Sequence, residues 1–192
     1  MKLLKDIHEL IDDRRGFRPA LHDVAPEICD AACLIVSAFN RGGRLFICGN
    51  GGSAADSQHM AAELVGRFRR DREGLPAIAL TTDTSALTAI ANDWEYDYVF
   101  RRQLEALCNP DDVILGISTS GSSKSILNAM EYARERALKT IGLVGGKDTR
   151  LEKLSDVAIA VGGSTTAIIQ ERMLAVEHII CECIDTLMLK DG

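Results

Sequence analysis

Short runs of continuous apolar residues alternate along the chain with longer segments in which apolar residues recur every three or four positions. The continuous runs predict buried strands at 44–48, 77–80, 113–117, 140–144 and 157–161. The periodic segments predict helices at 1–15, 24–40, 53–69, 85–91, 98–108, 123–137 and about 166–190. Strands that are apolar throughout and separated by helices are typical of a parallel sheet covered on both faces.

We therefore expect an α/β fold, a doubly wound five-stranded parallel sheet with extra N- and C-terminal helices. The 192 residues fit a single domain. Its N-terminal helices would occupy about 1–40, its α/β core about 44–162 and its C-terminal helix about 166–190. Ligands of open α/β sheets bind beyond the carboxyl ends of the strands. The loops that follow the predicted strands are therefore the places to look for a site.

Two of these loops suit an anionic group. Residues 49–53 read GNGGS and lead directly into a helix, so glycines allow close backbone approach and the helix start offers unpaired N–H groups. Residues 116–125 read GISTSGSSKS and place several hydroxyls at another junction between strand and helix. The alternatives are a tight turn with Ser53 as helix N-cap in the first loop, and a flexible capped loop in the second.

Two helices carry acid–base and metal-binding side chains. His59 and Glu63 are four residues apart and share one helix face, and Gln170 and His178 lie on the apolar C-terminal helix. Singly, each is a satisfied structural group in most proteins. Together, Glu63 suits a general base and His178 a general acid. Because zinc accepts imidazole nitrogen and carboxylate oxygen, the same residues also suit a metal site.

Composition narrows the function classes. A hydrophobic share of 46% and a charged share of 26% are those of a globular protein, which excludes a disordered or fibrous chain. The net charge of −6 argues against a protein dedicated to binding nucleic acids or anionic membranes. The first 15 residues are charged throughout and no apolar run approaches membrane-spanning length, so we expect a cytoplasmic protein. Six cysteines without a CxxC pair are expected to be reduced core thiols.

One basic stretch, 67–72 (RFRRDR), is a candidate contact for phosphate or nucleic acid. We favour a solvated helix end instead, because arginines near a helix C-terminus interact favourably with its negative dipole.

Several motifs, taken in order, resemble a known family. They are GNGGS at 49–53, the helix with His59 and Glu63, TTD at 81–83, Asn92 and Asp93, STS at 118–120, and the helix with Gln170 and His178. Over about residues 25–185 the chain resembles the sugar isomerase (SIS) family, and within it the phosphoheptose isomerases. The resemblance implies a flavodoxin-like αβα sandwich and an isomerase of phosphorylated sugars.

The same resemblance implies roles for individual residues and an assembly. It implies a homotetramer with its sites at subunit interfaces, a phosphorylated seven-carbon sugar as partner, and Glu63 and His178 as catalytic base and acid. It also implies a zinc ion held by His59, Glu63, Gln170 and His178. The substrate-binding residues that it implies are Asn50, Gly51, Gly52, Ser53, Glu63, Asn92, Asp93, Ser118, Thr119, Ser120, Ser123 and Gln170.

Three positions depart from the family pattern. The family usually has an arginine just before the Ile-Gln-Glu run and a histidine two residues after it, where this chain has Ile168 and Met173. Ala167 stands where a polar residue is common.

The expected reaction converts sedoheptulose 7-phosphate to D-glycero-D-manno-heptose 7-phosphate through an enediol. Two alternatives stay open. One is a non-catalytic SIS scaffold that binds a protein partner such as a replication initiator. Such relatives, however, have no acidic residue at the position of Glu63 and no histidine at the position of His178. The other is an isomerase of a different phosphosugar, which the three departures leave possible.

Overall fold

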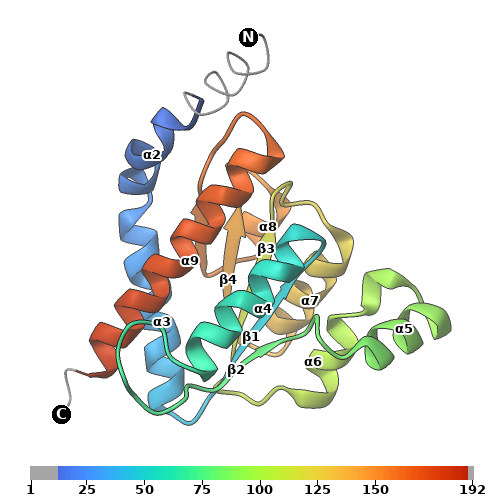
Figure 1. Ribbon diagram of the computed structural model, residues 1–192. Helices are drawn as coiled ribbons and strands as arrows, with labels where there is room; N and C mark the ends of the chain where they lie inside the picture. The colour runs from blue at the N-terminus through green and yellow to red at the C-terminus, as the bar shows by residue number, and fades with distance from the viewer. Residues whose placement is uncertain (1–12, 190–192) are drawn as a thin grey trace.

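A computed structural model describes residues 13–189, and Figure 1 shows how its helices and strands follow one another. The predicted helix at 1–15 therefore falls almost wholly outside the described residues. A 3-10 turn at Asp13–Gly16 comes first. The strands are β1 (Leu45–Gly49), β2 (Ala77–Ala79), β3 (Val113–Ser118), β4 (Lys139–Val144) and β5 (Val157–Ala160). The helices are α2 (Phe17–Asp23), α3 (Ala25–Asn40), α4 (Gly52–Val65), α5 (Thr84–Asp93), α6 (Arg101–Leu107), α7 (Lys124–Glu135), α8 (Arg150–Lys153) and α9 (Thr166–Met188).

All five strands form one parallel sheet in the order β2-β1-β3-β4-β5. This is the flavodoxin-like order, so the expected fold class is confirmed. The strands β1 and β3 are neighbours, with Leu45 paired to Val113 and Gly49 to Ile117. Their following loops consequently emerge side by side at the carboxyl edge of the sheet, as the sequence predicts for a site.

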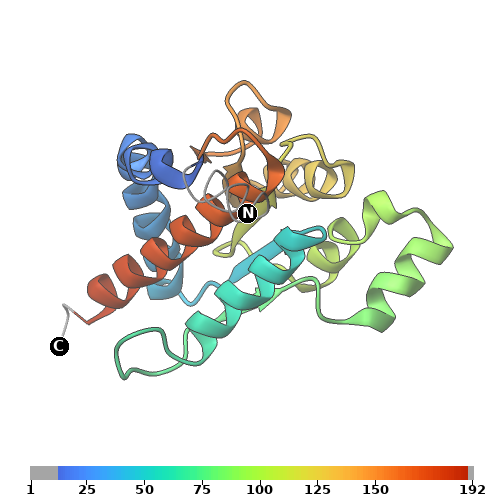
Figure 2. The ribbon, with the colours of Figure 1, turned by 45° about the horizontal axis from the view of Figure 1, so that its top comes forward.

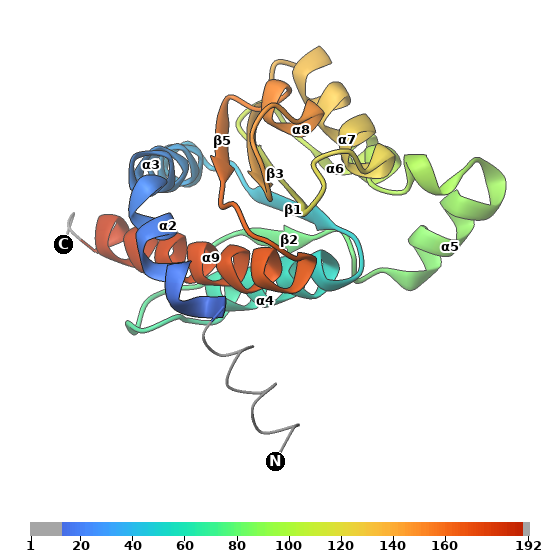
Figure 3. The ribbon, with the colours of Figure 1, turned by 90° about the horizontal axis from the view of Figure 1, so that it is seen from above.

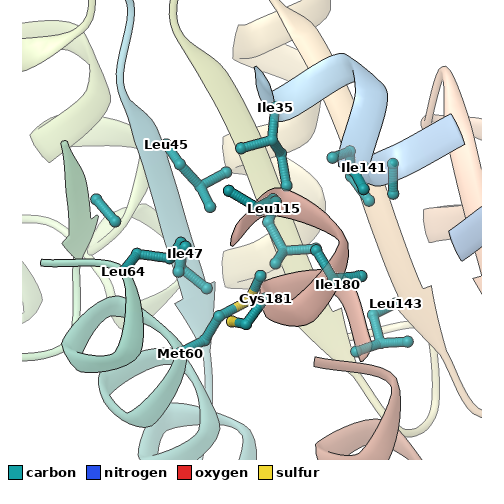
Figure 4. Packing of buried hydrophobic residues seen from close by; sticks show 14 of the residues in the cluster. Ile35, Leu45, Ile47, Met60, Leu64, Leu115, Ile141, Leu143, Ile180 and Cys181 are labelled. Atoms are coloured by element: carbon teal, nitrogen blue, oxygen red, sulfur yellow. The ribbon is translucent and has the colours of Figure 1, made fainter. Parts of the chain in front are cut away.

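Helices cover both faces of the sheet. Alternate residues of β1 point to opposite sides, because successive side chains of a strand do so. Leu45 and Ile47 join a core with α3, α4 and α9, whereas Phe46 and Cys48 join a second core with α6, α7 and α8. Figure 4 shows the first core, in which Ile47 lies near Met60 of α4 and Leu115 near Ile180 of α9.

Two helices of that first layer, α4 and α9, lie side by side (Figures 1 and 2). The contacts between them follow the same order along both helices: Gln170 contacts Ser53, and further along each helix His178 contacts His59. The helices therefore run in the same direction, and residues spaced along each face one another in register.

The helix α5 projects away from the rest of the chain (Figures 1 and 3). None of its residues is buried. Trp94 and Tyr96, just beyond its end, are each 54% exposed.

Several predicted boundaries were wrong. The predicted helix at 53–69 ends at Val65, where Gly66 breaks the backbone geometry, and 66–76 is an irregular segment, the return segment, that leads back to β2. The basic stretch lies in that segment, not on a helix end. Helices α2 and α8 were missed. Of the six cysteines only Cys48 and Cys181 are buried, while Cys29 and Cys33 are exposed.

In the part of the chain that the structure describes, no helix is both long enough and apolar enough to cross a membrane.

Candidate active site

The loops after β1 and β3 are joined by a short hydrogen-bond chain. The Asn50 amide donates to the hydroxyls of Ser123 at 2.7 Å and Ser125 at 2.9 Å. The Tyr96 hydroxyl donates to the side-chain oxygen Oδ1 of Asn50 at 2.8 Å. Asn50 thus connects three segments that are distant in sequence, and it brings the two loops predicted to bind an anion to one place.

The start of α4 has the geometry of an open helix N-terminus. Gly51 is the N-cap, with a φ of 56° that favours glycine, and no side chain caps the helix. The alternative of Ser53 as N-cap is therefore wrong. Ser53 lies one residue inside the helix and is buried. At Gly52 a Cβ atom would come within 2.8 Å of the Gln170 side-chain oxygen, so glycine here leaves room for the Gln170 side chain.

Hydroxyl groups of the loop after β3 hydrogen-bond within the loop. The Gly121 N–H donates to the Ser118 hydroxyl at 3.1 Å, and the Ser122 N–H donates to that of Ser120 at 3.3 Å. Ser123 precedes α7 without capping it, which leaves its hydroxyl to accept from Asn50. The loop is thus held in shape while presenting hydroxyls beside a second helix N-terminus.

A second group of polar residues lies between α4 and α9. The Nε2 atoms of His59 and His178 are 2.8 Å apart, close enough for one ring to donate to the other. Glu63 places Oε1 3.6 Å from the His59 Nε2. The His59 and Glu63 side chains are 42% and 25% exposed, so a solute can reach them. The structure therefore unites three of the predicted residues.

Gln170 lies with a different set of residues. Its amide nitrogen donates to the Asp56 carboxylate and lies 3.5 Å from the Ser53 hydroxyl. Burial raises the pKa of Asp56 to about 6, opposed by the charge of His59. The predicted ligand Gln170 is thus about two helical turns from His178 on α9, and its amide is already engaged.

Zinc can be tested against this arrangement. Imidazole nitrogen and carboxylate oxygen are zinc ligands, so His59, Glu63 and His178 fit the ion by donor chemistry. Gln170 does not join them. Within residues 13–189, no group of three or more histidine, cysteine, aspartate or glutamate side chains is arranged to hold a metal ion. Zinc therefore stays a prediction.

Comparison with known proteins decides the family. Residues 16–145 match the SIS domain family. A phosphoheptose isomerase of Pelobacter propionicus is 46% identical over 95% of this chain and 97% of its own, and one of Aliarcobacter butzleri is 51% identical over 93% and 95%. The solved structure of a phosphoheptose isomerase from Francisella tularensis superposes with a TM-score of 0.91 at 35% identity, over 97% of this chain and 100% of that one.

The chain belongs to the SIS domain family, among the phosphoheptose isomerases. The family expected from the motifs is thereby confirmed.

Two further residues expected from the phosphoheptose isomerase pattern lie on α5. Asn92 and Asp93 end the projecting helix α5, where the Asn92 amide donates to the Asp93 carboxylate at 3.0 Å. Of the three departures, Ile168 and Met173 are buried in this chain and only Ala167 is exposed. Ile168 and Met173 thus contribute to packing.

Sequence reasoning missed one buried acidic residue of this family member. Glu177 is fully buried beside His178, and neither of its carboxyl oxygens has a hydrogen-bond partner among the described residues. Burial, aided by the charge of Asp56, raises its pKa to about 9. A glutamate within an apolar helix next to a histidine was the signal that could have identified it.

Proposed function

We propose that this protein interconverts sedoheptulose 7-phosphate and D-glycero-D-manno-heptose 7-phosphate. The observation that carries the proposal is the convergence of Glu63, His59 and His178 between α4 and α9. The reaction moves a proton between adjacent carbons, so it requires a base at the carbon and an acid at the carbonyl oxygen. A carboxylate and an imidazole in one accessible cluster supply both.

Each side chain then has a defined task. Glu63 removes a proton from C1 of the ketose while His178 donates a proton to the C2 oxygen, which gives the enediol. Return of a proton to C2 and removal of the proton from the C1 oxygen completes the aldose. His59, hydrogen-bonded to His178 and close to Glu63, holds both in place and exchanges a proton with the His178 ring.

The phosphate is assigned to the loops at the carboxyl edge of the sheet. The uncapped start of α4 supplies backbone N–H groups and Ser53, and the loop after β3 supplies hydroxyls. Neutral donors at two helix N-termini hold a dianion in a protein whose net charge is negative.

Zinc forms a separate part of the proposal. It is the alternative use of the same three side chains: when bound, the ion would be held by His59, Glu63 and His178 in place of the proton transfers given above, and it would polarise the sugar carbonyl. Elemental analysis of the purified protein and of a His59→Ala variant tests this assignment. We expect zinc in the first and its loss in the second, and equal metal content would contradict it.

We also propose a homotetramer in which two chains share each site. Ser53 and Glu63 are separated by about 15 Å along α4, because ten residues of a helix rise that far. The phosphate and the reacting carbons lie at opposite ends of the sugar. The projecting α5, with no buried residue, supplies a surface for a second copy.

Light scattering of the purified protein, and mixing of two inactive variants, test the assembly. Four chains of 20.9 kDa are expected. Chains carrying Glu63→Gln, mixed with chains carrying Ser123→Asp, whose carboxylate repels the phosphate from its assigned loop, should regain activity if two chains build one site. A monomer, or mixtures that stay inactive, would contradict the shared site.

Turnover of sedoheptulose 7-phosphate, followed by appearance of the aldose, tests the reaction itself. Other phosphosugars of five and six carbons serve as comparison substrates, each with and without added zinc. Highest kcat/KM on the heptose is expected. Faster turnover of another sugar would move the assignment to that sugar, and no turnover of any would support the non-catalytic scaffold.

A further inference from the structure

The return segment that follows α4 is held against α9 by one buried carboxylate, that of Asp185. The Arg72 Nε donates to Asp185 Oδ1 at 2.6 Å, and the two side chains are only 4% and 0% exposed. The backbone N–H groups of Arg69 and Arg70 donate to the other oxygen at 3.2 and 3.3 Å. Three donors from one segment thus converge on Asp185.

Arg72 also fixes this segment to the end of α4. Its guanidinium donates to the main-chain oxygen of Leu64 at 2.9 Å and to that of Glu63 at 3.1 Å. The last turn of α4 leaves both carbonyls without partners inside the helix, and that of Leu64 also accepts from the Leu75 N–H at 2.9 Å. The end of α4, the return segment and α9 are therefore held together around Arg72, whose guanidinium contacts the main chain of Glu63 directly.

The return segment places the Phe68 ring against the His178 ring. The two ring centroids are 5.5 Å apart at an interplanar angle of 30°, which is a stacked arrangement. His59 meets the same imidazole edge-on, with centroids 5.0 Å apart at 61°. His178 is thus bounded by an aromatic face and by a hydrogen-bonded neighbour.

We propose that Phe68 is a positioning residue that orients the His178 imidazole, and that the Arg72–Asp185 pair holds Phe68 in place. The inference rests on the proposed role of His178 as the acid. The terminal torsion of histidine is broad, so the direction of the ring nitrogens depends on what packs against the ring. Proton transfer depends steeply on that direction, and small misplacements of reacting groups lower rates by up to about a hundredfold.

Substitution of Phe68 provides the kinetic test. Phe68→Leu keeps an apolar side chain but removes the stacking ring, and Phe68→Tyr restores the ring. We expect Phe68→Leu to lower kcat by roughly 10- to 100-fold with little change in KM, and Phe68→Tyr to retain kcat. Phe17→Leu, the same change at a half-buried position on α2, is the control and should leave kcat unchanged.

A double-mutant cycle separates positioning from general packing. If Phe68 acts through His178, Phe68→Leu should change the residual rate of a His178→Asn protein by less than about twofold. An equal fall in both backgrounds, or a Phe68→Leu protein as fast as wild type, would overturn the inference.

Ring resonances of the protein's four histidines provide a test that does not depend on activity. The His178 signal, assigned with His178→Asn, should be shifted by the Phe68 ring current and should move in Phe68→Leu. An unmoved signal would overturn the inference even if no sugar is turned over. If the signal moves but the protein does not turn over sedoheptulose 7-phosphate, the proposed function is contradicted and the positioning of His178 by Phe68 is not.

Discussion

Replacing Arg72 with methionine breaks the buried contact on which the return segment depends. Methionine keeps much of the side-chain volume but removes the charge and every donor. The change leaves the Asp185 carboxylate fully buried with only the N–H groups of Arg69 and Arg70 as partners. It also leaves two carbonyl oxygens at the end of α4 without the guanidinium.

The expected loss follows from these contacts. Removing one partner of a buried ion pair lowers the free energy of unfolding by about 3 to 5 kcal/mol, because the remaining charge is left in the interior. Arg72→Met should therefore lose at least about 3 kcal/mol. The double variant Arg72→Met/Asp185→Asn should regain part of this loss, since no buried charge remains.

Urea unfolding at one fixed protein concentration measures the change, and Arg69→Met is the matched control. Arg69 lies in the same segment and pairs with Glu182 at 3.0 Å, but its side chain is 70% exposed. Exposed pairs contribute at most about 1 kcal/mol. If Arg72→Met is no more destabilising than Arg69→Met, the claim that the Arg72–Asp185 pair holds the return segment against α9 is refuted.

Three further changes test other parts of the structure. Glu177→Met should raise the free energy of unfolding by about 1 to 3 kcal/mol, because it replaces a buried carboxyl without partners by an apolar side chain of similar length, and a lower melting temperature would contradict this. Asn50→Ala removes the link to Ser123 and should raise KM roughly tenfold while leaving kcat nearly unchanged, which steady-state kinetics would show. Burial alone raises the pKa of Asp156, but hydrogen bonds from Thr140 outweigh it and lower the pKa below 3.8. The stability that Asp156 contributes is thus fully present above pH 3.8 and is lost as the pH falls through the pKa of the folded state. Asp156→Asn should therefore be less stable than wild type near neutrality and equal to it in strong acid.

The fold was predictable from the sequence because its signals are local. Apolar runs such as 113–117 and the glycines after β1 specify buried strands and the turns that follow them. Neighbouring strands β1 and β3 then bring the two loops together without any further information. The shared helix face of His59 and Glu63 was predictable for the same reason, since it depends only on spacing.

The remaining features depend on contacts between distant segments. Spacing alone could not show that His178 reaches His59 while Gln170 turns to Asp56. The helical pattern also ran past Val65, and it did not show that Gly66 ends α4 or that Arg72 binds Asp185 after the chain turns back.

The rate of Glu63→Gln on sedoheptulose 7-phosphate, measured beside wild type, tests the central claim most directly. Glu135→Gln is the control, because the same change is made on the opposite face of the sheet at a side chain that is 58% exposed. The account predicts that kcat/KM falls by about 10² to 10⁴ in Glu63→Gln and stays near wild type in Glu135→Gln. A Glu63→Gln protein that isomerises the sugar at the wild-type rate would contradict it.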